Sequence, residues 1–239
     1  SMKKIVVAPD SFKGSLTSAE VADAVERGIK DVFPQCNVVK AGVADGGEGT
    51  VEAIVKAVGG DMYTASVTDP LGRPVKAAYG IVRSGGVKTA VMEMSAASGL
   101  PLLLPDELNP WITSTYGTGE MISDALNRGC RKFLIGIGGS ATNDAGTGML
   151  SALGVRFLDS RGQRLKGCGR DLESIARINM SSLMPAARES EFIVACDVNT
   201  PFCGPDGAAR VFAPQKGADP QTAEALDRGM RSFARVIAG

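Results

Sequence analysis

Short apolar runs alternate with segments whose apolar residues recur at helical spacing, and this pattern predicts strands followed by helices. Lys3–Ala8 is a β-branched run, and apolar residues at helical spacing follow it between positions 21 and 33. A second run at Asn37–Val43 is followed by an apolar helix face between Val51 and Val58, which stops at two glycines. Two successive strand–helix units predict a parallel sheet with helices packed on its faces.

The middle of the chain has a different pattern. Three further strands are predicted at Met62–Thr68, Val75–Val82 and Val87–Met94. Turn-forming residues separate them at Asp69–Arg73 and Arg83–Gly86, without an intervening helix. This section should therefore form an antiparallel or mixed sheet.

Strand–helix alternation resumes afterwards. A helix is predicted at Thr118–Arg128, a strand at Lys132–Ile137 and a helix at Thr147–Leu153, with a glycine-rich loop between the last two. Further strands are expected at Val155–Leu158 and Glu191–Cys196. Together these elements indicate an α/β protein in which the carboxyl ends of several strands lead into polar loops, where ligands bind in open α/β sheets.

Composition excludes several classes of function. The 26 basic residues balance the 26 acidic ones, so neither nucleic acid nor an anionic membrane surface is favoured as a partner. The chain has no histidine, which removes the commonest general base and every His-based catalytic or metal site. Phosphoryl transfer suits the remaining inventory, because it relies on positioning and on charge neutralisation by amides, cations and Mg²⁺.

Cysteine usage and hydropathy favour a cytoplasmic location. The five cysteines are odd in number and form no CxxC pair, which fits a reducing compartment better than a disulfide framework. No apolar stretch approaches the roughly 18 residues needed to span a bilayer. We therefore expect a cytoplasmic protein that acts on small molecules.

The glycine loop after the strand at 132–137 is the strongest candidate for an anion site. In the sequence Lys132–Gly148, KFLIGIGGSATNDAGTG, glycines allow backbone N–H groups to approach an oxyanion, and Ser140 and Thr142 can donate hydrogen bonds. The structural alternative is a tight turn in which Asn143 or Asp144 caps the following helix. The segment has neither a Walker motif nor a GxGxxG motif, so it does not name a ligand.

Two other loops and three single residues share this chemistry. Ile5–Lys13 and Gly42–Thr50 each place an acid and small or hydroxyl residues after an apolar run, but an N-cap or a turn explains them too. Asp197 follows an apolar strand and can bind metal, act as a base or begin a turn. Glu93 lies inside an apolar strand and requires a partner if it is buried, which a structural hydrogen bond would equally provide. Lys216 could lie against phosphate, although an exposed lysine is the commoner case.

Several motifs in one order carry a resemblance to a known family. The motifs are APDSFKGSL (8–16), ADGGEGTV (44–51), DPLGRPV (69–75), ASGLPL (97–102), TYGTGE (115–120), GIGGSATNDAGTGM (136–149), ACDV (195–198), PFCGPDGA (201–208) and FAPQKGA (212–218). Taken together they resemble the bacterial glycerate kinase family that is not of the P-loop type, over residues 3 to about 235.

The resemblance implies ATP-dependent phosphorylation of D-glycerate, most often to the 2-phosphate. It also implies two α/β domains, one of them Rossmann- or flavodoxin-like and built from both ends of the chain. We expect residues 1–61 to be the N-terminal part of that domain and residues 62–239 to form the second domain, which has a mixed sheet and carries the GGSATND loop. Members of the family continue beyond this C-terminus with further glycine-rich and acidic segments, so the first domain should be incomplete here.

Within that activity we assign roles to the loop residues as hypotheses. Asp45 or Asp197 would accept the hydroxyl proton of glycerate, and Lys13 would neutralise charge on the transferred group. Asp144 or Asp197 would engage the Mg²⁺ that accompanies ATP. The residues expected to hold phosphate or the glycerate carboxylate are Asp10, Ser11, Gly46, Gly47, Gly138, Gly139, Ser140, Thr142 and Asn143. The alternative is a shortened, non-catalytic module that binds anions or nucleotides without turnover.

Overall fold

A five-stranded mixed sheet forms the centre of the molecule. The computed structural model describes residues 4–7, 37–40, 49–195 and 200–238. The order of the strands in the sheet is β3-β4-β5-β6-β9, in which β3, β4 and β5 pair antiparallel while β5, β6 and β9 pair parallel. These strands are β3 (Gly60–Thr68), β4 (Pro74–Ser84), β5 (Val87–Glu93), β6 (Lys132–Gly136) and β9 (Glu191–Ala195). The predicted mixed section and its α/β class are confirmed.

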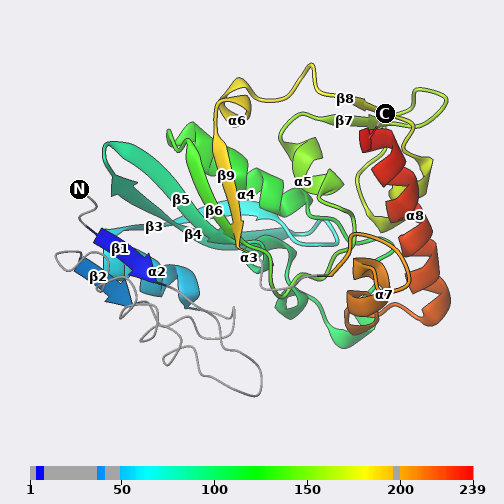
Figure 1. Cartoon of the computed structure of the whole chain (residues 1–239), viewed down its shortest axis with the longest axis horizontal. Helices are drawn as coiled ribbons and strands as arrows, with labels where there is room; N and C mark the ends of the chain where they lie inside the picture. Colours follow the sequence, from blue (N-terminus) through cyan, green and yellow to red (C-terminus); the bar gives the residue numbers. More distant parts are fainter. Residues whose placement is uncertain (1–3, 8–36, 41–48, 196–199, 239) are drawn as a thin grey trace.

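Helices cover both faces of this sheet (Figure 1). Helix α2 (Thr50–Val58) packs on one face, where its Val51 and Val55 meet Val82 and Val91. Gly80 on β4 makes this close approach possible, because a Cβ at that position would lie 3.3 Å from Val51 Cγ1 and closer still to Val55. On the other face α4 (Tyr116–Asn127) packs against the buried side chains of alternate strand residues. Burial on both faces fixes the register of the strands.

A second hydrophobic cluster lies beyond the end of the sheet. It forms around α8 (Pro220–Ala238), which packs against the 3₁₀ helix Gly169–Ser174 through Leu226, Met230 and Phe233. Figure 1 shows α8 and the pair β1–β2 at opposite ends of the molecule. The short elements around this cluster are α5 (Thr147–Ala152), β7 (Arg156–Leu158), β8 (Arg177–Asn179) and α7 (Ala208–Phe212). Two further helices, α3 (Ser95–Ser98) and α6 (Pro185–Arg188), belong to the connections.

The first predicted strands also form, as a separate parallel pair. Strand β1 (Lys4–Val7) pairs with β2 (Asn37–Lys40). The helix predicted between positions 21 and 33 lies outside the described residues. Helix α2, which the predicted boundary at residue 61 assigns to the first domain, packs on the five-stranded sheet of the second. The division into 1–61 and 62–239 stays a prediction.

Candidate functional site

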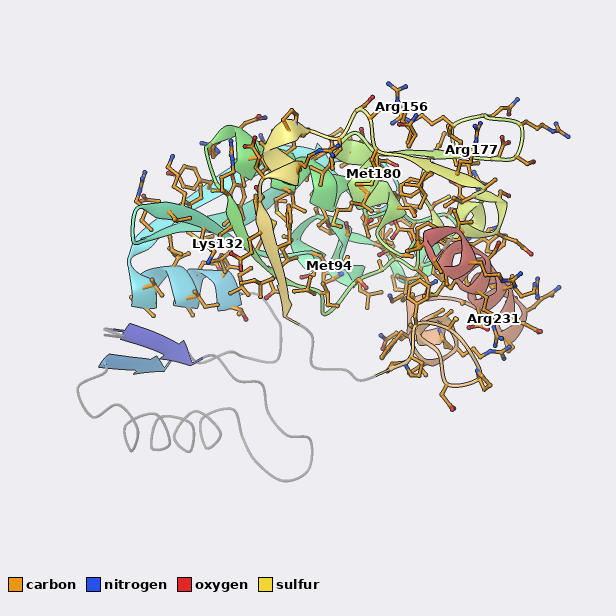
Figure 2. All side chains as sticks on the ribbon, turned by 45° about the horizontal axis from the view of Figure 1, so that its top comes forward. Met94, Lys132, Arg156, Arg177, Met180 and Arg231 are labelled. Carbon is orange, nitrogen blue, oxygen red and sulfur yellow. The ribbon has the colours of Figure 1, made fainter. Side chains whose placement is uncertain are left out.

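Three parallel strands end together at one edge of the sheet. Glu93 of β5 is in register with Gly136 of β6, which is in register with Ala195 of β9. Figure 2 shows Met94, the residue after Glu93, near the end of β9. Loops that follow parallel strands meet at such an edge, so this is where the sequence places its candidate chemistry.

The glycine loop after β6 is fastened to the segment that follows β5. Met94 N–H donates to Gly136 O at 2.9 Å, and Leu100 N–H donates to Gly139 O at 2.9 Å. Ala141 N–H donates to Ser98 O, also at 2.9 Å. These three bonds extend the β5–β6 pairing beyond the sheet and hold the loop in one conformation.

The outer part of the loop keeps its amides available. Gly138 and Gly139 are exposed and Ser140 is half-buried. Among the described residues, no protein group accepts a hydrogen bond from the backbone N–H of Gly138, Gly139 or Ser140. Gly139 has a φ of 67°, a conformation that favours glycine. Adjacent free amides on a held loop can bind an oxyanion, as the sequence predicts for these three residues.

Lys216 lies directly beneath this loop. Its Nζ donates to Ser140 Oγ at 2.9 Å and to Thr142 O at 2.5 Å, and the residue is 8% exposed. Burial lowers the pKa of this amine to about 8, with the charge of Asp144 acting in the opposite direction. The sequence interpretation of Lys216 as an exposed lysine is therefore wrong. The loop carries a buried cation, which adds positive potential on the side of its free amides.

The inner part of the loop faces the protein. Thr142 and Asn143 are buried, and Asn143 Nδ2 lies 3.3 Å from Met230 Sδ of α8. Thr142 contributes its carbonyl to Lys216, as described above. The two residues connect the loop to the second hydrophobic cluster. Ligand binding by these two side chains stays a prediction.

Asp144 organises the start of α5. Its Oδ2 accepts hydrogen bonds from Thr115 N at 2.8 Å, from Thr115 Oγ1 at 2.7 Å and from Gly148 N at 3.2 Å, and its Oδ1 accepts one from Gly146 N at 3.1 Å. The residue is 1% exposed, and burial raises the pKa of its carboxyl group against the effect of these donors. Both oxygens already have protein partners. The geometry supports the capping alternative and gives no support to metal binding by Asp144.

The first turn of α5 is likewise satisfied by the protein. Thr147 N–H donates to Asp144 O at 3.0 Å, and Met149 N–H donates to Thr115 Oγ1 at 2.9 Å. The positive end of α5 therefore has no free amide among its first three residues. An anion bound by the glycine loop would therefore contact the exposed turn at 138–140 rather than the start of α5.

Glu93 stands out among the acidic residues of the edge. It is partly buried, and burial raises the pKa of its carboxyl group. Within the described part of the chain no hydrogen bond or ion pair reaches this carboxylate, so the partner expected from the sequence is absent there. Its side chain lies over Gly136, where a Cβ would come within 2.6 Å of Glu93 Cδ.

Several predicted site residues lie outside the described residues. They are Asp10, Ser11, Lys13, Asp45, Gly46, Gly47 and Asp197. In the described ranges no three His, Cys, Asp or Glu side chains group in a way that could hold a metal ion. None of the helices in those ranges is both long and apolar enough to cross a membrane.

Comparison with known proteins shows which family this chain belongs to. The model of the glycerate kinase family matches residues 5–239. The chain belongs to the glycerate kinase family. It is 50% identical over 233 residues to a glycerate kinase of Haemophilus influenzae and 47% identical over 234 residues to a glycerate 2-kinase of Escherichia coli; each match covers 98% of this chain and 61% of the relative.

A solved structure supports the same placement in the glycerate kinase family. A crystal structure of a protein assigned as glycerate kinase 2 from Salmonella typhimurium superposes with a TM-score of 0.78 at 46% identity, over 100% of this chain and 63% of that one. The chain thus spans a little over three fifths of the length of these relatives. The resemblance predicted from ordered motifs is confirmed.

Proposed function

We propose that this chain is a glycerate kinase, which transfers the γ-phosphoryl group of ATP to D-glycerate and favours the 2-phosphate as product. The observation that supports this most directly is the loop at 138–140, whose amides have no acceptor in the described part of the chain and which is hydrogen-bonded through Ser140 to the buried ammonium of Lys216. Phosphoryl transfer depends on such fixed donors and cations.

We assign the outer loop to an anionic group of the reactants. Gly138, Gly139 and Ser140 would donate to phosphate oxygens or to the carboxylate of glycerate. Lys216 would neutralise part of that charge through Ser140, to which it is hydrogen-bonded. This role adds to the sequence hypothesis a cation that comes from a segment 76 residues away.

Other assignments stay hypotheses of the sequence. Lys13 would neutralise charge on the transferred group, Asp10 and Ser11 would help to bind substrate, and Asp45 or Asp197 would take part in proton transfer. The Mg²⁺ ion that accompanies ATP requires oxygen ligands, for which Asp197 is the sequence candidate. Asp144 is not carried forward as a ligand, because its two oxygens already accept four hydrogen bonds. The supply of ATP favours a cytoplasmic location.

The alternative is a module that binds anions without turnover. It is favoured by one observation, that the chain covers 61% of its relatives' length. Glycerate-dependent ADP release, measured on the 239-residue chain and on a fusion carrying the remaining C-terminal part of the H. influenzae relative, separates the two. Release by both supports a kinase complete in this chain, and release by the fusion alone makes this chain a binding part. Absence of release from both, with normal folding, refutes the proposal.

A further inference from the structure

An acceptor hydroxyl must lose its proton during phosphoryl transfer, and this inference rests on the kinase function proposed above. The base should stand at the edge that carries the anion-binding loop. It should also be free of strong protein donors, because a carboxylate already held by N–H groups is a weaker acceptor for a substrate proton. Asp144 fails this second requirement.

We propose that Glu93, in place of the sequence candidates Asp45 and Asp197, is the catalytic base that accepts the hydroxyl proton of the acceptor. Its carboxylate lies at the end of β5, beside Gly136, the last residue of β6, after which the glycine loop begins. Neither the sequence hypotheses nor the comparisons assign a catalytic role to it.

The first support is that the fold makes room for this carboxylate. Glu93 and Gly136 are in register on neighbouring parallel strands, and a Cβ at Gly136 would overlap both oxygens of the Glu93 carboxylate. Because Gly136 has no side chain, the Glu93 carboxylate can occupy the space next to β6. The carboxylate therefore lies beside Gly136, two residues before Gly138.

The second support is that no described group offsets the free-energy cost of partly removing this carboxylate from water. Removing a carboxylate from water without a partner is unfavourable, and buried acids in proteins are normally paired. Glu93 has no such partner among the described residues, and burial raises the pKa of its carboxyl group without a contribution from a described charged group. A structural glutamate would be expected to hold something in place. An unpaired acid at a ligand edge is instead typical of a functional group.

The step balances without a further reactant. The glycerate hydroxyl oxygen forms a bond to the γ-phosphorus of ATP while the bond from that phosphorus to the β–γ bridging oxygen breaks. The hydroxyl proton passes to a Glu93 carboxylate oxygen, and ADP leaves with the electron pair of the broken bond. Glu93 then releases the proton to solvent, which restores the carboxylate for the next turnover.

The decisive variants are Glu93→Gln and Glu93→Asp, with Glu191→Gln as the matched control. Glu191 lies at the opposite end of the same sheet, on β9, and is an exposed partner of Lys132 at 3.0 Å. In the form of the protein that turns over, E93Q should lower kcat by about 100-fold or more, within the range of general-base catalysis. KM for glycerate should change far less, E93D should recover part of the rate, and E191Q should behave as wild type.

The melting temperature at pH 7 distinguishes a catalytic Glu93 from a structural one. Loss of a structural carboxylate would lower the melting temperature. Because E93Q removes a desolvated charge that has no described partner, its melting temperature should equal or exceed that of wild type. A lower melting temperature, or a kcat within fivefold of wild type, would overturn the assignment while leaving the kinase function intact. If wild type and the fusion both fold and neither releases ADP, the kinase function itself fails and this assignment fails with it.

Discussion

Replacing Lys216 by methionine should change how the stability of the protein depends on pH. Methionine keeps most of the apolar stem and removes the ammonium that donates to Ser140 Oγ and Thr142 O. Because the folded protein binds the Lys216 proton with a pKa of about 8, whereas the reference value is 10.5, the unfolded chain holds this proton over a wider range of pH. Between these two values the unfolded state binds more protons, so the stability of wild type rises with pH.

The magnitude follows from the same two values. A fall from 10.5 to about 8, at 1.36 kcal/mol per pKa unit, corresponds to about 3 kcal/mol over the whole window. Between pH 7.5 and pH 9.5 the wild-type free energy of unfolding should therefore gain about 2 kcal/mol relative to K216M. Below pH 7.5 the difference between the two proteins should be nearly constant.

Urea unfolding at several pH values, followed by circular dichroism under reducing conditions, measures this difference. Lys132→Met removes a half-exposed lysine on β6, which is paired with the exposed Glu191, and so reports the alkaline effects that do not depend on a deeply buried ammonium. If the difference between wild type and K216M stays within about 0.5 kcal/mol from pH 7.5 to pH 9.5, Lys216 does not lie buried beneath the loop and the reasoning fails.

Four further outcomes are expected. Asp144→Asn should keep any magnesium-dependent rise in melting temperature that wild type shows; loss of that response would restore a metal role for Asp144. Gly136→Ala should cost about 1–3 kcal/mol in urea unfolding and reduce turnover, because its Cβ displaces the Glu93 carboxylate, and an unchanged protein would contradict the packing. Tyr79→Phe, which removes a 2.6 Å hydrogen bond to Asp124, should cost about 1 kcal/mol, and no loss would mean that the bond contributes nothing. Asp197→Asn should raise the Mg²⁺ concentration needed for half-maximal rate by about tenfold or more, whereas an unchanged requirement would remove Asp197 as a ligand.

Local patterns in the sequence were sufficient for the sheet and for the position of the glycine loop. The strand at 132–137 and the helix at 147–153 match β6 and α5 within a residue or so, since alternating burial and helical spacing are local signals. The apolar spacing of Ala223, Leu226, Met230 and Phe233 is also a helical signal, and it corresponds to α8, which is not among the predicted helices.

The chemistry of individual side chains was harder to predict, because it depends on contacts between distant segments. Lys216 is buried because a 3₁₀ turn places it under a loop 76 residues earlier in the chain, and composition favours an exposed lysine at such a position. Asp144 had two interpretations until Thr115, on the segment before α4, proved to be its partner. The sequence identified Glu93 as unusual, and only the register with Gly136 showed where its carboxylate lies.

The central claim is that the edge formed by Glu93, Gly136 and the loop at 138–140 transfers phosphate to an acceptor hydroxyl. Phosphorus NMR of a reaction that contains glycerate, Mg²⁺ and ATP tests this claim most directly. The wild-type protein in its active form should convert the γ-phosphate resonance into that of a glycerate phosphomonoester with matching formation of ADP, and E93Q should produce almost none in the same time. Formation of inorganic phosphate alone, or equal product from wild type and E93Q, would contradict the account.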